Sequence, residues 1–268
     1  KRSDATMILP FSMDDLLALI HSTRPIIMDA YAARQVTVKG LADYVTAVDL
    51  GVQHYLEGAL PRLCPDAQLL AEEEAKWSID PARPFWVLDP IDGTTNLMHD
   101  YQQSCVALAY CAEGAIQCAV VYNPFREETF SALRGEGGWL NGAPIQVSRH
   151  PDLAHSLTVF GTTPYDKSKS VSVFERARRL FCASEDVRRG GSAELDLCYV
   201  ACGRTECFVE LDLKPWDFCA GMLILEEAGG RLTDEAGNTP CLYRNSDVVA
   251  SNGLVHQELL ALLGDAPV

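Results

Sequence analysis

Apolar residues recur every three or four positions in two segments near the start of the chain. The first spans residues 13–33, with Ser12 placed as an N-cap and acidic residues in the first turn, and it predicts a helix. Pro25 lies inside this segment, so we expect the helix to kink or break there. The second segment predicts a helix over residues 46–60.

The middle of the chain carries shorter apolar runs, which predict strands. Runs of this kind occupy residues 68–71 and 85–88. Two longer runs within residues 104–130 flank the turn residues Glu113 and Gly114, an arrangement typical of a β-hairpin.

A polar, proline-containing segment from Ser148 to His155 separates two parts of the chain. We therefore predict an N-terminal α+β part over residues 1–150 and a C-terminal α/β part over residues 151–268. Strand-like and helix-like runs alternate in the second part, over residues 157–160, 173–182, 193–202, 207–211 and 218–228.

Charge and composition narrow the classes of function. The chain has 268 residues and a formal net charge of −15, which argues against a basic face for nucleic acid and against unaided binding of an anion. A bound divalent cation would solve the second problem locally. We find no signal peptide and no apolar run near the ~20 residues of a membrane span, so we expect a soluble protein. Ten cysteines without metal-ligand or disulfide spacing predict reduced thiols and a cytoplasmic location.

The most informative chemistry lies after the apolar run 85–88, in the sequence Asp89-Pro90-Ile91-Asp92-Gly93-Thr94. We predict that the strand ends at residue 88 and that the two carboxylates share one turn. Like charges at close range repel each other unless a cation lies between them. Carboxylate oxygens suit Mg²⁺, which also binds waters and substrate phosphate. The motif therefore predicts metal-assisted phosphate chemistry.

Acidic residues also follow two other apolar runs. Glu72 begins a run of three glutamates after residues 68–71, and Asp217 precedes the predicted helix 218–228. Each has an ordinary explanation when taken alone, because glutamates are common in solvated turns and an aspartate stabilises a helix N-terminus through the helix dipole.

Taken together, these segments resemble the inositol monophosphatase family, a group of magnesium-dependent, lithium-sensitive phosphatases. The resemblance covers about residues 39–251 and rests on these motifs: Glu72-Glu73, the segment 89–96, Trp216-Asp217 with Ala220-Gly221, and Glu227-Ala228-Gly229-Gly230. It implies a layered αβαβα sandwich of the α/β class and a homodimer.

The resemblance also implies roles for individual residues. Glu72, Asp89 and the backbone carbonyl of Ile91 would hold one Mg²⁺, whereas Asp89, Asp92 and Asp217 would hold a second. Glu72 with waters would hold a weaker third ion, and Mn²⁺ is a possible substitute.

The same resemblance implies the catalytic and substrate-binding groups. Thr94, supported by Asp49, would orient the attacking water, and Glu72 would take part in catalysis as a metal ligand. The substrate would contact Asp92, the backbone amides of Gly93 and Thr94, Gly191, Ala193, Glu210 and Lys39.

These roles imply hydrolysis of a small phosphate monoester, with inositol monophosphate as the leading substrate and no nucleic-acid or membrane partner. Two alternatives stay open at this point. One is a related phosphatase of fructose 1,6-bisphosphate, 3′-phosphoadenosine 5′-phosphate or another sugar or nucleotide phosphate. The other is a non-catalytic scaffold, which the presence of every expected acid disfavours.

Overall fold

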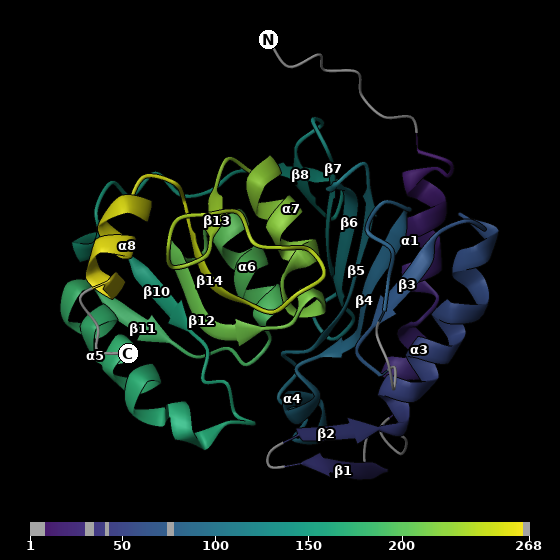
Figure 1. Cartoon of the computed structure of the whole chain (residues 1–268), viewed down its shortest axis with the longest axis horizontal. Helices are drawn as coiled ribbons and strands as arrows, with labels where there is room; N and C mark the ends of the chain where they lie inside the picture. Colours follow the sequence, from purple (N-terminus) through teal and green to yellow (C-terminus); the bar gives the residue numbers. More distant parts are fainter. Residues whose placement is uncertain (1–8, 30–34, 41–42, 74–77, 265–268) are drawn as a thin grey trace.

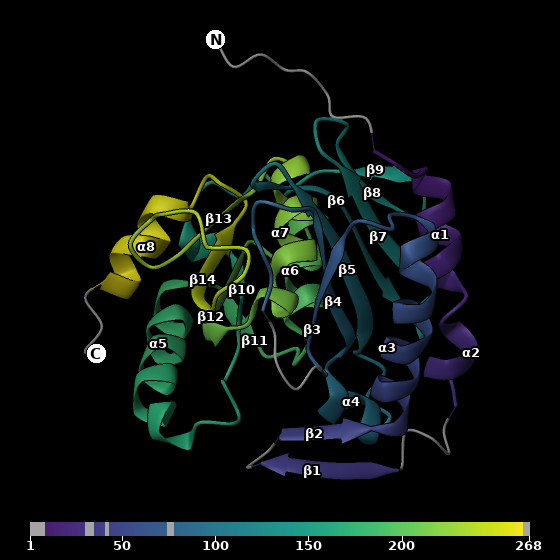
Figure 2. The same cartoon turned by 45° about the vertical axis from the view of Figure 1, so that its right-hand side comes forward.

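Two β-sheets alternate with three layers of helices in the computed structural model, which describes residues 9–29, 35–40, 43–73 and 78–264. Figure 1 shows the order of the layers: α5 with α8, a five-stranded sheet, α6 with α7, a seven-stranded sheet, and α1 with α3. The view in Figure 2 shows the same order, with the ribbon β1–β2 below the layers. The predicted αβαβα sandwich is therefore confirmed.

The predicted helix over residues 13–33 is two helices, α1 (Met13–His21) and α2 (Arg24–Ile27). The side chain of Ser12 accepts from Asp15 N, which caps α1 as expected. Pro25 lies in the first turn of α2, where a missing N–H costs no hydrogen bond, so the chain breaks before the proline. Residues 30–33 of the prediction lie outside the described residues.

The second predicted helix is confirmed as α3 (Ala47–Ala59), followed by a 3₁₀ turn, η2 (Leu60–Arg62). Thr46 caps α3, and Asp49 completes a capping box by accepting from Thr46 N at 2.8 Å. The antiparallel ribbon of β1 (Val36–Gly40) and β2 (Asp43–Thr46) leads directly into this cap.

The seven-stranded sheet has the order β3-β4-β5-β6-β7-β8-β9 and is antiparallel except for the pair β3–β4. The predicted hairpin is the pair β5–β6, joined at Glu113 and Gly114. The strands are β3 (Gln68–Ala71), β4 (Phe85–Asp92), β5 (Cys105–Ala112), β6 (Ala115–Asn123), β7 (Glu128–Leu133), β8 (Gly138–Leu140) and β9 (Ala143–Ile145). The short helix α4 (Thr94–Met98) follows β4.

The five-stranded sheet has the order β11-β10-β12-β14-β13 and is mixed, because β10 runs parallel to β11 and β12 whereas β14 is antiparallel to its neighbours. Its strands are β10 (Leu157–Phe160), β11 (Asp186–Arg188), β12 (Cys207–Leu213), β13 (Arg231–Thr233) and β14 (Ser246–Ser251). The longer helices are α5 (Ser170–Ala183), α6 (Ala193–Ala201), α7 (Cys219–Glu227) and α8 (His256–Gly264). The 3₁₀ turns are η3 (Leu153–His155), η4 (Lys167–Lys169) and η5 (Pro215–Asp217).

Three hydrophobic clusters fill the spaces between the layers. The central cluster packs α6 and α7 between the two sheets, and the others lie under α1–α3 and under α5 and α8. The central cluster contains residues of both sheets, so it joins the two predicted parts of the chain. The division of the chain near residue 150 therefore stays a prediction. All ten cysteines are free of disulfides, as expected. Among the described helices, none has both the length and the apolar character needed to cross a membrane.

Candidate active site

A cleft of about 360 Å³ opens where β4, α4, η5 and the loops before α5 and α6 meet. Its walls come from segments far apart in the chain, since β4 belongs to one sheet and the two loops adjoin the other. Ten of the residues named from the sequence line it: Glu72, Asp89, Ile91, Asp92, Gly93, Thr94, Gly191, Ala193, Glu210 and Asp217. The sequence motifs thus converge on one place.

Strand β4 carries both aspartates of the central motif, which corrects the prediction that the strand ends at residue 88. It continues to Asp92, and the register against β5 shifts between Asp89 and Asp92. A bulge of this kind re-aims side chains beside a site. Asp89 accepts from Ile91 N at 2.9 Å through one oxygen, and its side chain is buried.

Glu72 reaches the cleft from the neighbouring strand. Strand β3 pairs in parallel with β4, and Glu72 N continues this pairing by donating to Leu88 O at 3.3 Å. Parallel strands end at the same edge of a sheet, so the carboxylates that follow β3 and lie on β4 are neighbours.

Asp217 lies at the end of the 3₁₀ turn η5, two residues before α7 begins at Cys219. The prediction that it lies at the start of the apolar helix is confirmed, and a short separate turn that begins at Pro215 precedes that helix. Asp217 Oδ2 accepts from Lys214 N at 2.7 Å, which fixes the carboxylate toward the cleft.

Burial raises the pKa values of all four acids. Burial is the largest cause for Glu72, Asp89 and Asp217, whose pKa values lie well above the usual range, and the negative charges of neighbouring acids add to it. The pKa of Asp92 is also raised by burial, although hydrogen bonds from Ser192 and Glu194 oppose the shift. Such a cluster favours a bound cation, which would offset both the burial and the repulsion.

The donor atoms of this cleft fit a hard divalent cation. On the acidic side of the cleft they are carboxylate oxygens and the carbonyl oxygen of Ile91, and oxygen ligands are the kind that Mg²⁺ takes. Within the described residues, no group of three or more His, Cys, Asp or Glu side chains is already placed so that it could hold a metal ion. Mg²⁺ needs only one or two carboxylates alongside waters and phosphate oxygens, so an open site still fits it.

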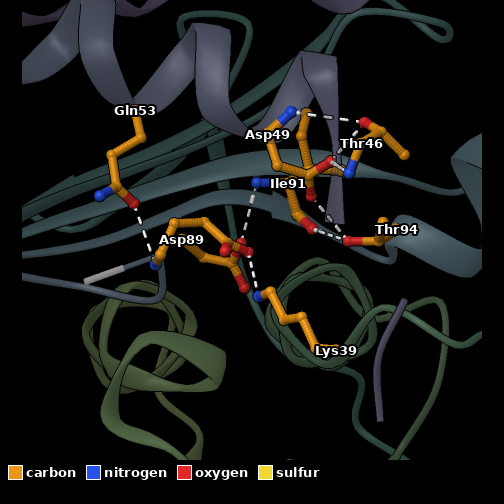
Figure 3. Close-up of polar contacts among 8 residues, drawn as sticks. Lys39, Thr46, Asp49, Gln53, Asp89, Ile91 and Thr94 are labelled. Atoms are coloured by element: carbon orange, nitrogen blue, oxygen red, sulfur yellow. Dashed lines mark hydrogen bonds and ion pairs between the residues drawn. The ribbon is translucent and has the colours of Figure 1, made fainter. Parts of the chain in front are cut away.

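Thr94 and Asp49 form a hydrogen-bonded pair at one side of the cleft, shown in Figure 3. Thr94 Oγ1 lies 2.8 Å from Asp49 Oδ1 and 3.1 Å from Ile91 O. A hydroxyl has one proton, and a carboxylate is the stronger acceptor, so Thr94 donates to Asp49 and keeps lone pairs for another donor. The other oxygen of Asp49 accepts from Thr46, and burial raises the pKa of Asp49.

Gly93 joins β4 to α4 at a position that only glycine fits. Its φ is +90°, and a Cβ there would lie 2.8 Å from the carbonyl oxygen of Gln103. The turn is tied down nearby, because Asn96 donates to the carbonyl oxygens of Gln103 and Gly190. These bonds hold the Gly93–Thr94 segment against the loop that carries Gly191.

Of two further residues predicted to contact the substrate, Glu210 lines the cleft and Lys39 does not. Glu210 lies on β12, lines the cleft and accepts from Thr163 N at 3.0 Å, and burial raises its pKa to about 7. Lys39 is not among the lining residues: its Nζ donates to Glu73 Oε1 at 2.5 Å, and its charge lowers the pKa of Glu72. Figure 3 shows Lys39 in this neighbourhood.

Three residues that the sequence analysis did not identify also line the cleft: Tyr165, Lys167 and Arg189. Arg189 Nη2 donates to Thr162 Oγ1 at 3.0 Å, and its charge lowers the pKa of Glu210. Tyr165 is 53% exposed, yet burial raises the pKa of its hydroxyl well above 10, with further contributions from Asp217 and Glu72. Only Arg189, two residues before Gly191, carried a sequence signal that could have found it.

The chain matches the model of the inositol monophosphatase family over residues 16–266. It is 39% identical to inositol-1-monophosphatase of Synechocystis over 238 residues, which are 87% of this chain and 82% of that protein. It is 36% identical to Nus factor SuhB of Escherichia coli over 237 residues, which are 88% of this chain and 87% of that protein.

Solved structures show the same similarity. Extragenic suppressor protein suhB from Bartonella henselae has a TM-score of 0.87 and 30% identity, covering 94% of this chain and 98% of that one. Two structures of IMPase/NADP phosphatases, one with D-inositol-1-phosphate and one with Mg²⁺ and phosphate, each have a TM-score of 0.83 and 27% identity, covering 94% and 95% of the two chains. The LiCl-soaked inhibitory complex of a staphylococcal inositol monophosphatase has a TM-score of 0.84 and 27% identity, covering 94% of both chains. The chain therefore belongs to the inositol monophosphatase family.

Proposed function

We propose that the chain is a Mg²⁺-dependent phosphatase that hydrolyses small phosphate monoesters, with inositol monophosphate as the leading substrate. The observation that carries this proposal is the meeting of four buried or half-buried acids in one cleft beside the pair Thr94–Asp49. The relatives support a phosphatase and a divalent metal, since one solved structure is of an IMPase/NADP phosphatase with Mg²⁺ and phosphate.

The metal ligands would be those that line the acidic wall. Glu72, Asp89 and the carbonyl of Ile91 would hold one cation, and Asp89, Asp92 and Asp217 another. Cations bound there would neutralise the phosphate, lower the pKa of water and stabilise the departing oxygen. The number of ions and the preference for Mg²⁺ over Mn²⁺ are part of the proposal.

Thr94 and Asp49 would orient the attacking water. Because Thr94 donates to Asp49, its oxygen can accept a hydrogen bond from the water and aim a lone pair of the water at phosphorus. The raised pKa of Asp49 makes this carboxylate a better proton acceptor than an exposed aspartate. The backbone amides of Gly93 and Thr94 would hold a phosphate oxygen.

A second wall of the cleft would bind the leaving group. Glu210, Gly191 and Ala193 line it, and the Glu210 carboxylate is an acceptor for the hydroxyls of a polyol. Arg189 and Tyr165 add donors beside this acceptor. A polyol phosphate presents both a phosphate and several hydroxyls, so it matches the two walls together. Lys39 would contribute through its charge rather than as a lining group.

A nucleotide phosphate is the second candidate substrate, because the neighbours with a TM-score of 0.83 are described as IMPase/NADP phosphatases. The name Nus factor SuhB of the Escherichia coli relative makes a role outside catalysis the third candidate. The retained acids and the net charge of −15 favour the enzyme over a nucleic-acid binder. The absence of a nucleic-acid partner and a homodimeric state remain predictions.

Release of inorganic phosphate from a panel of substrates tests the proposal. The panel contains inositol 1-phosphate, fructose 1,6-bisphosphate, 3′-phosphoadenosine 5′-phosphate and NADP, each with Mg²⁺, with Mn²⁺ and with a chelator. We expect metal-dependent release that is fastest with inositol 1-phosphate and is lost in Asp92→Asn. Release that survives the chelator, or an Asp92→Asn variant as active as the parent, would refute the catalytic assignment. Faster turnover of a nucleotide would overturn only the substrate ranking.

A further inference from the structure

Glu194 is a buried acid on the first turn of α6 that does not line the cleft. Its carboxylate accepts from the backbone amides of two consecutive residues of α7: Oε1 from Ala220 N at 3.0 Å and Oε2 from Gly221 N. The first N–H groups of a helix have no partner within that helix. Glu194, on α6, therefore caps the N-terminus of the neighbouring helix α7.

The backbone of Glu194 makes a second connection, to the central motif. Its N–H donates to Asp92 Oδ2 at 2.7 Å, and the same oxygen accepts from Ser192 Oγ at 2.6 Å. One residue thus holds Asp92 with its main chain and the start of α7 with its side chain. Asp217 lies only three residues before Ala220, so the segment held by Glu194 is the one that positions Asp217.

The junction between α6 and α7 has no free space. A Cβ at Gly221 would lie 2.6 Å from the Cβ of Leu197 and 2.7 Å from Oε2 of Glu194. Glycine lets the two helices approach closely enough for the carboxylate to reach both amides. In the described part of the chain, no Lys, Arg or His side chain forms an ion pair with Glu194.

An acid in this position is electrostatically unfavourable. A buried carboxylate without a cation is costly, and Asp92 and Asp217 repel it, whereas a neutral side chain would avoid both costs. A carboxylate, however, can accept from two amides with two oxygens, which neither an amide nor a hydrocarbon side chain does. The two hydrogen bonds are therefore what the acid contributes.

We propose that Glu194 is a positioning residue that sets the separation of Asp92 and Asp217 and so tunes the metal affinity of the cleft. This inference rests on the proposed function, because it takes both aspartates to be metal ligands. Groups that orient metal ligands from behind affect metal affinity by about 10- to 100-fold when they are replaced.

Glu194→Gln tests the inference, with Glu227→Gln as a matched control. Glu227 also accepts from two backbone amides, Gly135 N and Gly137 N, each at 2.9 Å, but it lies outside the cleft. The measurement is Mg²⁺ binding by calorimetry, with no substrate present. We expect Glu194→Gln to bind Mg²⁺ about tenfold more weakly and Glu227→Gln to bind it as the parent does.

A second variant keeps the result interpretable if the glutamine variant does not fold. Glu194→Met keeps the volume and removes the charge, and we expect the same loss of Mg²⁺ affinity. A purely structural role would lower the unfolding temperature without changing the dissociation constant of Mg²⁺. A folded variant with parental Mg²⁺ affinity overturns the inference, and so does the failure of both variants to fold, because Glu194 would then serve the fold as a whole. If the parent itself neither binds Mg²⁺ nor releases phosphate, the proposed function is the part that is wrong.

Discussion

Thr94 Oγ1 lies 2.8 Å from Asp49 Oδ1, although the two residues are 45 positions apart in the chain. Thr94 is the last residue of the central motif and the first of α4. Asp49 lies in the first turn of α3, where its other oxygen closes the capping box of Thr46. The same carboxylate therefore caps a helix and orients a hydroxyl in the cleft. Figure 3 shows the pair with Thr46 and Ile91.

We expect Asp49→Asn to lower kcat by about 100-fold or more while KM changes little, because the variant loses the proton acceptor behind Thr94 without removing a phosphate contact. Steady-state phosphate release measures both constants. Asp15→Asn is the matched control, since Asp15 accepts from Ser12 Oγ at 2.7 Å in the cap of α1 and does not line the cleft. An equal loss of kcat in both variants would show that the effect comes from a weakened cap alone.

Tyr165 is a second target, because its hydroxyl lies among the acids of the cleft although half of the side chain is exposed. Its raised pKa keeps the phenol neutral, so it can donate to an anionic oxygen of the substrate. Loss of a hydrogen bond to a charged group predicts a rise of about tenfold in KM for Tyr165→Phe, with a smaller change in kcat. Tyr101→Phe, at a 65% exposed tyrosine that does not line the cleft, should leave both constants unchanged. Parental kinetics in Tyr165→Phe would remove the residue from the substrate site.

Tyr165 and Arg189, two of the three cleft residues that the sequence analysis missed, show what the sequence could not predict. Glu72, Asp89 and Asp217 were identifiable because each lies next to an apolar run, so a local pattern places the acid at the edge of a sheet or beside a helix. Tyr165 and Arg189 lie in loops whose positions depend on contacts with β12 and with Thr162, which no local pattern encodes.

The same limit applies to the fold. Alternation of strands and helices predicted an α/β second part, and the resemblance to the family implied the layers. The bulge that carries β4 through Asp92 was not predicted, because it arises from the register of β4 against β5, a pairing between segments. Glu194 resembles an ordinary acid in the first turn of a helix, and only the packing of α7 against α6 shows what it holds.

Glu210 gives a pH dependence, because burial raises its pKa to about 7. Only the ionised carboxylate accepts hydrogen bonds with both oxygens, so substrate binding should weaken as the pH falls through 7. At one unit below its pKa about a tenth of the group is ionised, which predicts a rise in KM approaching tenfold between pH 8 and pH 6. Glu210→Gln should have a raised KM that no longer changes over this range. A parent-like pH profile of KM in that variant would assign the titration to another group.

We expect replacement of Asp89 by asparagine to stabilise the metal-free fold and to abolish activity. Folding raises the pKa of Asp89, so the folded chain binds the Asp89 proton more tightly than the unfolded chain does. The stability that this provides is fully present at acid pH. It is lost as the pH rises from the usual pKa near 3.8 through the raised pKa. At neutral pH without metal, the ionised group therefore destabilises the fold.

Asp89→Asn should raise the unfolding temperature in chelator by about 2–4 °C for each kcal/mol relieved, while phosphate release and the stabilisation by Mg²⁺ disappear. Asp66→Asn, at an exposed aspartate outside the cleft, should change none of these. Scanning calorimetry with chelator and with Mg²⁺ decides the matter, and an Asp89→Asn protein that Mg²⁺ still stabilises as strongly as the parent would show that Asp89 does not hold the metal.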